Sequence, residues 1–203
     1  MTSLAETTRS LRARDRKALV AYFTAGYPDD ASFDSLVRAA VDAGADIIEV
    51  GIPFSDPIAD GPIIQKTSGE ALARGMTLTR ALETIARLSP QIEVPVVVMS
   101  YVNPILRFGV DAFAHAAARE DVESLVARVR AATDTPVYVG FGVSTPDTAA
   151  TIASVSDGVI IGSRLMQLAG DGPASGSASR VADFLAGVRD KLDRLAGDVK
   201  SRS

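Results

Sequence analysis

Apolar residues along this chain form two kinds of pattern. Short continuous runs predict strands buried on both faces, and apolar residues three or four positions apart predict helices packed against them. The predicted strands cover residues 18–26, 45–51, 94–104, 136–142 and 157–163. Helical patterns lie between these runs and again from Val181 to Leu195. This βα order predicts a parallel α/β protein, either an open doubly wound sheet or a barrel.

Glycine and proline mark the expected element boundaries. Gly44 and Gly75 are expected to end helices, and Pro62 and Pro146 are expected in the first turns of others. Residues 170–179, GDGPASGSAS, predict a flexible connector before the last helix.

One interval departs from the βα order. Two helical patterns between residues 110 and 132 are separated only by the charged residues 119–121, with no strand between them. An eight-stranded barrel usually needs about 250 residues, and this chain has 203. The count of predicted strands is therefore five.

Composition and charge narrow the classes of function. The chain is 47% hydrophobic and 23% charged, which is typical of one soluble domain, and a net charge of −4 with scattered cations argues against nucleic acid or a membrane surface as partner. It has no cysteine and one histidine, His115, so we expect no disulfide, no metal site and no cysteine nucleophile. No apolar run approaches the ~20 residues of a membrane span, and no signal peptide is recognised, so a cytoplasmic location is expected.

Two acids flank the stretch EVGIPFSDPIADG at the end of a predicted strand. Ligands of parallel α/β folds gather at the carboxyl ends of the strands. Side chains alternate along a strand, so Glu49 is expected to point into the barrel interior with Ile47 while Ile48 packs on helices. A carboxyl group that lies among apolar groups has a raised pKa and can carry a proton near neutral pH. The alternatives are an ion pair that fixes Glu49 and, for Asp60, a helix N-cap. The intervening prolines suit either a preset site or a docking surface.

Glycines follow the last two predicted strands, in GFGVST (140–145) and IGS (161–163). Backbone N–H groups there can hold a phosphate, as they do after the last strands of barrel enzymes. A dinucleotide site is the weaker alternative because the third glycine of its motif is missing. Three aromatic residues lie at strand ends, Tyr22, Phe23 and Tyr101. They can line a pocket for a planar ligand, although aromatic residues at such positions are at least as often part of the hydrophobic core. These residues indicate acid–base catalysis on a small phosphorylated molecule.

Five stretches of the chain combine these features: AYFTAGYPD (21–29), GADIIEVGIPFSDPIADGPIIQ (44–65), MSYVNPILRFG (99–109), VGFGVST (139–145) and DGVIIGS (157–163). Together they resemble the tryptophan synthase alpha chain family. The resemblance covers residues 17–118 and 122–195 of a single domain, 1–203. It implies a TIM (β/α)8-barrel family fold and a lyase of L-tryptophan biosynthesis, which cleaves indole-3-glycerol phosphate by a retro-aldol reaction to indole and glyceraldehyde 3-phosphate.

The resemblance also implies a role for each candidate residue. Glu49 would protonate the indole ring at the carbon being released, and Asp60 would hold the indole N–H and stabilise the positive charge that develops there. Phe23 and Tyr101 would line the indole pocket. The phosphate cradle would comprise Gly142, Gly162 and Ser163, and the surface that meets the beta chain would comprise Pro53, Asp56 and Pro57. The beta chain, expected in an alpha2beta2 heterotetramer, would contain the pyridoxal phosphate, so no cofactor is expected in this chain.

The chain also departs from the family pattern. Three central strands, a tyrosine beside the substrate and a mobile loop that closes over the phosphate have no counterpart here. We therefore predict an incomplete barrel with about five parallel strands, open or closed by a second copy. The leading hypothesis is an alpha chain whose lyase activity is reduced by the shortening. Its alternatives are an inactive module that only docks on the beta chain, and an unrelated phosphate-binding barrel, which does not explain the paired Glu49 and Asp60.

Overall fold

The computed structural model of the chain describes most residues outside the interval that breaks the βα order. The described residues are 3–101, 104, 136, 138–140, 142–154 and 156–200, the last five for their backbone alone. The two helical patterns predicted between residues 110 and 132, with His115, lie outside the described residues.

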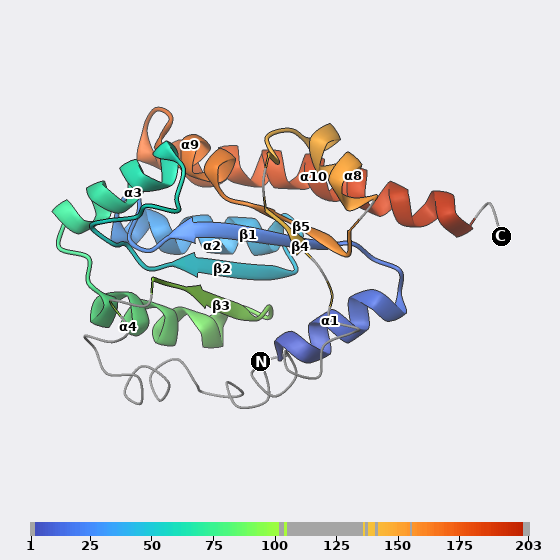
Figure 1. Cartoon of the computed structure of the whole chain (residues 1–203), viewed down its shortest axis with the longest axis horizontal. Coiled ribbons are helices and arrows are strands. Elements are labelled where there is room, and N and C mark those ends of the chain that lie inside the picture. The colour runs from blue at the N-terminus through green and yellow to red at the C-terminus, as the bar shows by residue number, and fades with distance from the viewer. Residues whose placement is uncertain are drawn as a thin grey trace.

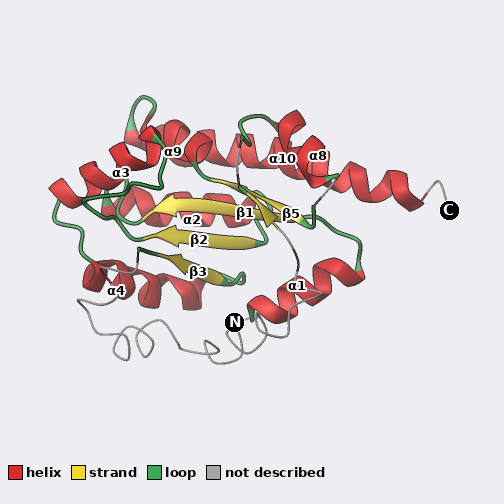
Figure 2. Ribbon diagram, in the orientation of Figure 1, coloured by secondary structure: helices red, strands yellow, loops and turns green. Residues whose placement is uncertain are grey.

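Five described strands form one parallel sheet (Figures 1 and 2). They are β1 (Ala18–Thr24), β2 (Ile47–Gly51), β3 (Val96–Met99), β4 (Tyr138–Val139) and β5 (Gly158–Ile161). Their order across the sheet is β3-β2-β1-β5-β4. Each strand lies within a predicted segment, so these predictions are confirmed. β3 and β4 stand at the two ends, and no pairing in the described part of the chain joins them, which leaves the sheet open.

Helices connect and cover the strands. They are α1 (Leu4–Ala13), α2 (Asp30–Asp42), α3 (Pro62–Ala73), α4 (Leu78–Leu88), α8 (Pro146–Ala153), α9 (Ser163–Gly170) and α10 (Ser177–Lys200), with short 3-10 helices η1 (Ser89–Gln91) and η2 (Ala174–Gly176). Gly44 and Gly75 follow α2 and α3 with φ of +94° and +80°, in the left-handed region that favours glycine, as expected. None of the described helices is long and apolar enough to cross a membrane.

The connector predicted for residues 170–179 is shorter than expected. The Ser177 hydroxyl donates to the Ala174 carbonyl at 2.7 Å, and the 3-10 turn of η2 runs directly into α10. The composition of this stretch indicated flexibility, but local hydrogen bonds of serine support a helix start equally well.

The two faces of the sheet differ in what they pack against. Phe23 is paired with Val50, and both belong to the large apolar cluster that includes residues of α2, α8, α9 and α10. We call this side the helix face. Tyr22 is paired with Glu49, and Glu49 with Val97, so these three side chains point to the opposite side, the inner face. The predicted alternation around Glu49 is therefore confirmed.

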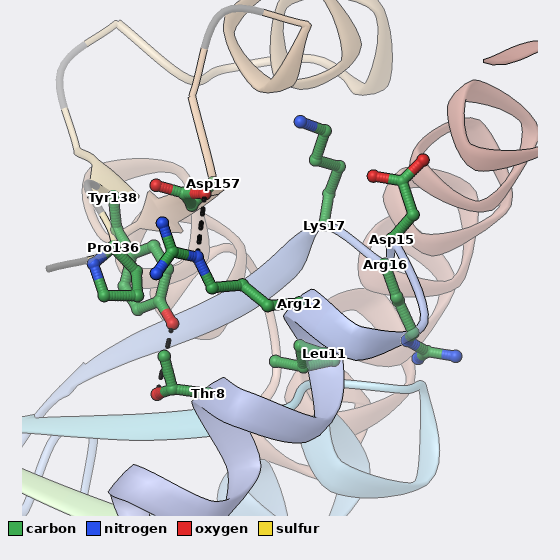
Figure 3. A pocket seen from close by; sticks show the side chains of 9 residues that line it. All are labelled: Thr8, Leu11, Arg12, Asp15, Arg16, Lys17, Pro136, Tyr138 and Asp157. Atoms are coloured by element: carbon green, nitrogen blue, oxygen red, sulfur yellow. Dashed lines mark hydrogen bonds and ion pairs between the residues drawn. The ribbon is translucent and has the colours of Figure 1, made fainter. Parts of the chain in front are cut away.

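Helix α1 lies at the amino ends of β4 and β5 (Figure 3). The Tyr138 hydroxyl donates to the Thr8 hydroxyl at 3.4 Å, and Arg12 lies 3.8 Å from the Asp157 carboxylate. A polar hollow of about 260 Å³ remains between the helix and the strands. It is at the opposite end of the sheet from Glu49 and the glycine turns, so it is separate from the predicted site.

Candidate active site

Glu49 is the middle residue of β2, on the inner face. Its side chain is half-buried, and among the described residues its carboxyl group forms no hydrogen bond or ion pair. Burial raises the pKa of this carboxyl above its ordinary value, because the charged form loses contact with water. The ion-pair alternative therefore has no support in the described part of the chain, and the carboxyl is left available to a ligand.

Asp60 precedes α3 but does not cap it. The N-cap residue is Gly61, no side chain caps the helix, and Pro62 occupies its first turn, so the N-cap alternative is wrong. Asp60 instead pairs with Tyr101, whose hydroxyl hydrogen-bonds to the carboxylate. Burial raises the pKa of Asp60, and the hydrogen bond from Tyr101 opposes that shift by favouring the charged form.

The aromatic residue beside Glu49 is Tyr22, where the resemblance implied Phe23. Phe23 is fully buried on the helix face, so the prediction that it lines the ligand pocket is wrong. Successive side chains of a strand point to opposite faces, and an error of one position moves a residue to the other face. Burial raises the pKa of the Tyr22 hydroxyl far above its usual value, and the nearby Asp60, Glu49 and Tyr101 raise it further. Tyr22 is thus close enough to the two acids and to Tyr101 for their charges to affect its pKa.

The glycine turns follow neighbouring strands. Gly162 is the N-cap of α9 and Ser163, its first residue, is exposed, directly after β5. Gly142 lies three residues beyond β4, is exposed and has a φ of +76°. Because β4 and β5 pair in parallel, both turns lie at the carboxyl edge of the sheet. They are therefore at the same edge as the end of β2, with β1 between.

The loop of residues 53–61 presents less surface than predicted. Pro53 is buried, so the prediction that it contacts a partner is wrong. Asp56 is exposed and Pro57 is partly exposed. Ile58, which the sequence analysis did not single out, is 91% exposed and is the one large hydrophobic side chain exposed to that degree in the described chain.

The same loop is tied to the site through Tyr101. The Ala59 N–H donates to the Tyr101 hydroxyl at 3.1 Å, and the Phe54 ring lies 5.0 Å from the Tyr101 ring, measured between centroids. On the other side the Gln65 amide donates to the Asp60 carbonyl at 2.9 Å. The loop and Asp60 are therefore held in one arrangement.

Metal ligands are not grouped in the described part of the chain, where no cluster of three or more histidine, cysteine or acidic side chains could hold an ion. The groups at the site are carboxyls and hydroxyls at the carboxyl ends of parallel strands. A protein with this sheet and these groups belongs to the parallel α/β class, in which ligands bind at the carboxyl ends of the strands.

The particular family follows from sequence comparison. The family model for the tryptophan synthase alpha chain matches residues 8–126 and 114–191. The tryptophan synthase alpha chain of Geobacter sulfurreducens is 34% identical over 262 aligned positions, which cover 95% of this chain and 99% of that protein. The one from Burkholderia thailandensis is 33% identical, covering 97% and 98%. This chain belongs to the tryptophan synthase alpha chain family.

Solved structures agree with this assignment. The alpha subunit of tryptophan synthase from Legionella pneumophila superposes with a TM-score of 0.85 at 26% identity, covering 96% of this chain and 99% of that one. A tryptophan synthase chain from M. tuberculosis, in an aminoacrylate-bound form, gives 0.80 at 30% identity, covering 93% and 98%. The sheet is therefore an incomplete form of the family's TIM barrel.

The comparisons also locate the shortening. The Geobacter alignment runs over 262 positions whereas this chain has 203 residues, so a sizeable part of the relative has no counterpart here. The two matches to the family model meet between residues 114 and 126. The missing part thus falls within the interval where the βα order breaks in the sequence.

Proposed function

We propose that this chain cleaves indole-3-glycerol phosphate to indole and glyceraldehyde 3-phosphate, as the alpha component of tryptophan synthesis. The observation that supports this most directly is the half-buried Glu49 carboxyl, which has a raised pKa and no described partner and faces the same side of the sheet as Tyr22. A general acid must hold its proton near neutral pH and must be free to give it to a ligand.

The chemistry assigns different tasks to the two acids. Glu49 in its protonated form transfers a proton to the ring carbon that bears the side chain. The bond from that carbon to the first side-chain carbon then breaks and its electron pair stays on the ring. The hydroxyl of the released carbon gives its proton to the carboxylate that Glu49 has become, so that this carbon becomes an aldehyde and Glu49 is protonated again. Asp60 in its charged form, which the Tyr101 hydrogen bond favours against the effect of burial, accepts a hydrogen bond from the ring N–H and stabilises the positive charge that protonation creates.

The remaining predicted groups bind the rest of the substrate and a partner. Gly142, Gly162 and Ser163 would hold the phosphate through backbone N–H groups at the carboxyl edge of β4 and β5. The 53–61 loop would dock on a tryptophan synthase beta chain in an alpha2beta2 assembly. Pyridoxal phosphate would belong to that beta chain, and this chain would need no cofactor of its own.

Indole release from indole-3-glycerol phosphate tests the proposal. Glu49→Gln removes the proton donor with little change in shape, and Asp60→Asn removes the charge; each is expected to lower the rate about 100-fold or more. Exposed acids supply matched controls: Glu83→Gln and Asp42→Asn are expected to leave the rate unchanged. Added beta chain is expected to increase the rate of the wild-type protein.

The same measurements can refute the proposed lyase activity. If the wild-type chain releases no more indole than Glu49→Gln and still stimulates the beta chain, the chain is a docking module without lyase activity. If it neither releases indole nor stimulates the beta chain, both hypotheses are wrong.

A further inference from the structure

We infer that Tyr22 is a specificity-determining residue of this site: its hydroxyl oxygen accepts a hydrogen bond from a hydroxyl group on the chain that links the aromatic ring of the ligand to its phosphate. This inference rests on the proposed function and names a contact that the function alone does not require.

Tyr22 lies on the strand between the proposed acid and one of the glycine turns. The proposed acid is on β2 and the Gly162 turn follows β5, and β1, which bears Tyr22, lies between these two strands. Neighbouring strands are about 4.8 Å apart, so β2 and β5 are separated by roughly 10 Å. A ligand with its ring near Glu49 and its phosphate at Gly162 must cross β1 with the segment that joins them.

The direction of the Tyr22 side chain also supports this inference. A Cβ atom added to Gly51 would lie 2.1 Å from the Tyr22 hydroxyl oxygen, and one added to Gly162 would lie 3.3 Å from the Tyr22 ring. The side chain therefore leans toward the carboxyl edge, with its hydroxyl over Gly51 and its ring beside the phosphate turn. Because Gly51 and Gly162 have no side chain, they leave the space that the Tyr22 side chain occupies.

A chain of buried hydroxyls sets the direction of the hydrogen bond. The Thr67 hydroxyl donates to the Ile64 carbonyl at 3.1 Å, so its single hydrogen is used. The Thr24 and Thr67 hydroxyl oxygens are 2.8 Å apart, and Thr24 must then be the donor to Thr67. The Thr24 hydroxyl has only one hydrogen, so it cannot also donate to Tyr22. In the contact between the Tyr22 and Thr24 hydroxyl oxygens, which are 3.5 Å apart, Tyr22 is therefore the donor. The lone pairs of the Tyr22 hydroxyl oxygen can then accept a hydrogen bond from a ligand in the site.

The protonation state of Tyr22 supports the same role. Burial raises the pKa of its hydroxyl far above the usual value, so the group stays neutral at any pH at which the protein works. A neutral oxygen that accepts one hydrogen bond distinguishes a ligand that has a hydroxyl from one that lacks it, because the oxygen would otherwise be buried without a partner.

Binding of two ligands tests the inference. One is indole-3-glycerol phosphate, and the other is indole-3-propanol phosphate, which has the same ring and phosphate but lacks both chain hydroxyls. Titration calorimetry on Glu49→Gln avoids turnover of the first ligand. Adding Tyr22→Phe is expected to weaken binding of the glycerol compound about fivefold, the effect of one neutral hydrogen bond, and not to weaken binding of the propanol compound, which forms no such bond.

Two further variants separate the hydroxyl from packing. Tyr27→Phe removes the hydroxyl of another buried tyrosine that lies outside the site, near Gly170, and should change neither affinity. Thr67→Val frees the Thr24 hydrogen to turn toward Tyr22 and occupy its lone pair, so the preference for the glycerol compound should fall. A preference that Thr67→Val leaves unchanged would contradict the hydroxyl chain.

The outcomes separate this inference from the proposed function. If Glu49→Gln binds neither compound, the proposed function is wrong and the inference fails with it. If it binds both, and Tyr22→Phe weakens both equally or neither, the function stands and the role of Tyr22 is refuted.

Discussion

Glu49 illustrates how the position of one residue in a strand sets its chemistry. Its neighbours Ile48 and Val50 are buried in the apolar cluster on the helix face, and the alternation of the strand turns the carboxyl to the inner face. Partial burial then disfavours the charged form. The burial that favours the protonated form of Glu49 also lowers the stability of the folded protein whenever this carboxyl is ionised.

This cost leads to a pH-dependent prediction. Burial raises the pKa of Glu49 in the folded protein above its ordinary value, so the folded state resists ionisation more than the unfolded chain does. Stability is unaffected well below pH 4.5 and is lost as the pH rises through the folded pKa. Glu49→Gln is therefore expected to melt at a higher temperature than wild type at pH 7.

Thermal unfolding of both proteins at a series of pH values checks this prediction. The difference in melting temperature should shrink toward zero near pH 4, and Glu83→Gln should show no such trend. An equal difference at every pH would mean that packing, and not charge, distinguishes glutamine from glutamate at this position.

At the scale of elements, the 53–61 loop combines a rigid base with an exposed apolar tip. Its base is fixed by Ala59 and Phe54 against Tyr101, while Ile58 is 91% exposed. An apolar side chain held out by a stiff loop suits an interface, since little order is lost when a partner covers it.

Ile58→Ser is expected to weaken binding to a beta chain about 10- to 100-fold without changing the stability of this chain. Burying a large aliphatic side chain contributes about 1.5–3 kcal/mol. Surface plasmon resonance on an immobilised beta chain measures the effect, and Ala86→Ser, on the exposed side of α4, is the control. Unchanged affinity for Ile58→Ser would place the interface elsewhere.

Helix α10 is attached to the sheet by a buried ion pair. Arg189 lies 3.0 Å from the Asp46 carboxylate and donates to the Lys17 carbonyl at 3.0 Å. Asp46 also accepts the Leu19 N–H at 2.9 Å, at the start of β1. The pair therefore joins the last helix to the starts of β1 and β2.

Removing Arg189 should be strongly destabilising, because among the described residues the buried Asp46 carboxylate then keeps only Arg16, at 3.3 Å, as a cationic partner. Arg189→Met is expected to lower the free energy of unfolding by about 3 kcal/mol or more. Arg194→Met breaks an exposed pair with Asp190 on the same helix and should cost less than about 1 kcal/mol. Urea denaturation of both variants measures the two values, and similar losses would argue against a special role for Arg189.

At the scale of the whole molecule, the open sheet should limit the rate more than any single side chain. Both proposed acids and the glycine turns are in place, but β3 and β4 do not pair in the described chain. Access of water and loose positioning of a ligand each reduce catalysis, and misplacement by about 1 Å can cost about 100-fold.

Restoring the missing part tests this view. Inserting the segment of the Geobacter sulfurreducens relative that has no counterpart here between residues 118 and 122 is expected to increase indole release about 100-fold. Insertion of a flexible glycine–serine segment of equal length is the control and should not increase it. If both insertions leave the rate unchanged, the shortening is not what limits activity.

The sequence by itself determined the elements and the acids. Continuous apolar runs placed all five described strands, glycines placed helix ends, and alternation placed Glu49 on the inner face, because these features depend on a few neighbouring residues. A local signal was also overlooked at α1, where Ser3 and Glu6 form a capping box. Serine and a glutamate three residues later would have predicted that helix.

The tertiary structure decided what depends on residues far apart in the chain. Register between β1 and β2 put Tyr22, and not Phe23, beside Glu49. The start of α3 at Gly61 showed that Asp60 is not a helix cap, Tyr101 came to lie beside Asp60, and the fold of the loop buried Pro53 and exposed Ile58. The hydroxyl chain from Thr67 to Tyr22 joins a helix to a strand 43 residues away. Such contacts form when strands and helices pack together, and no periodicity within one segment encodes them.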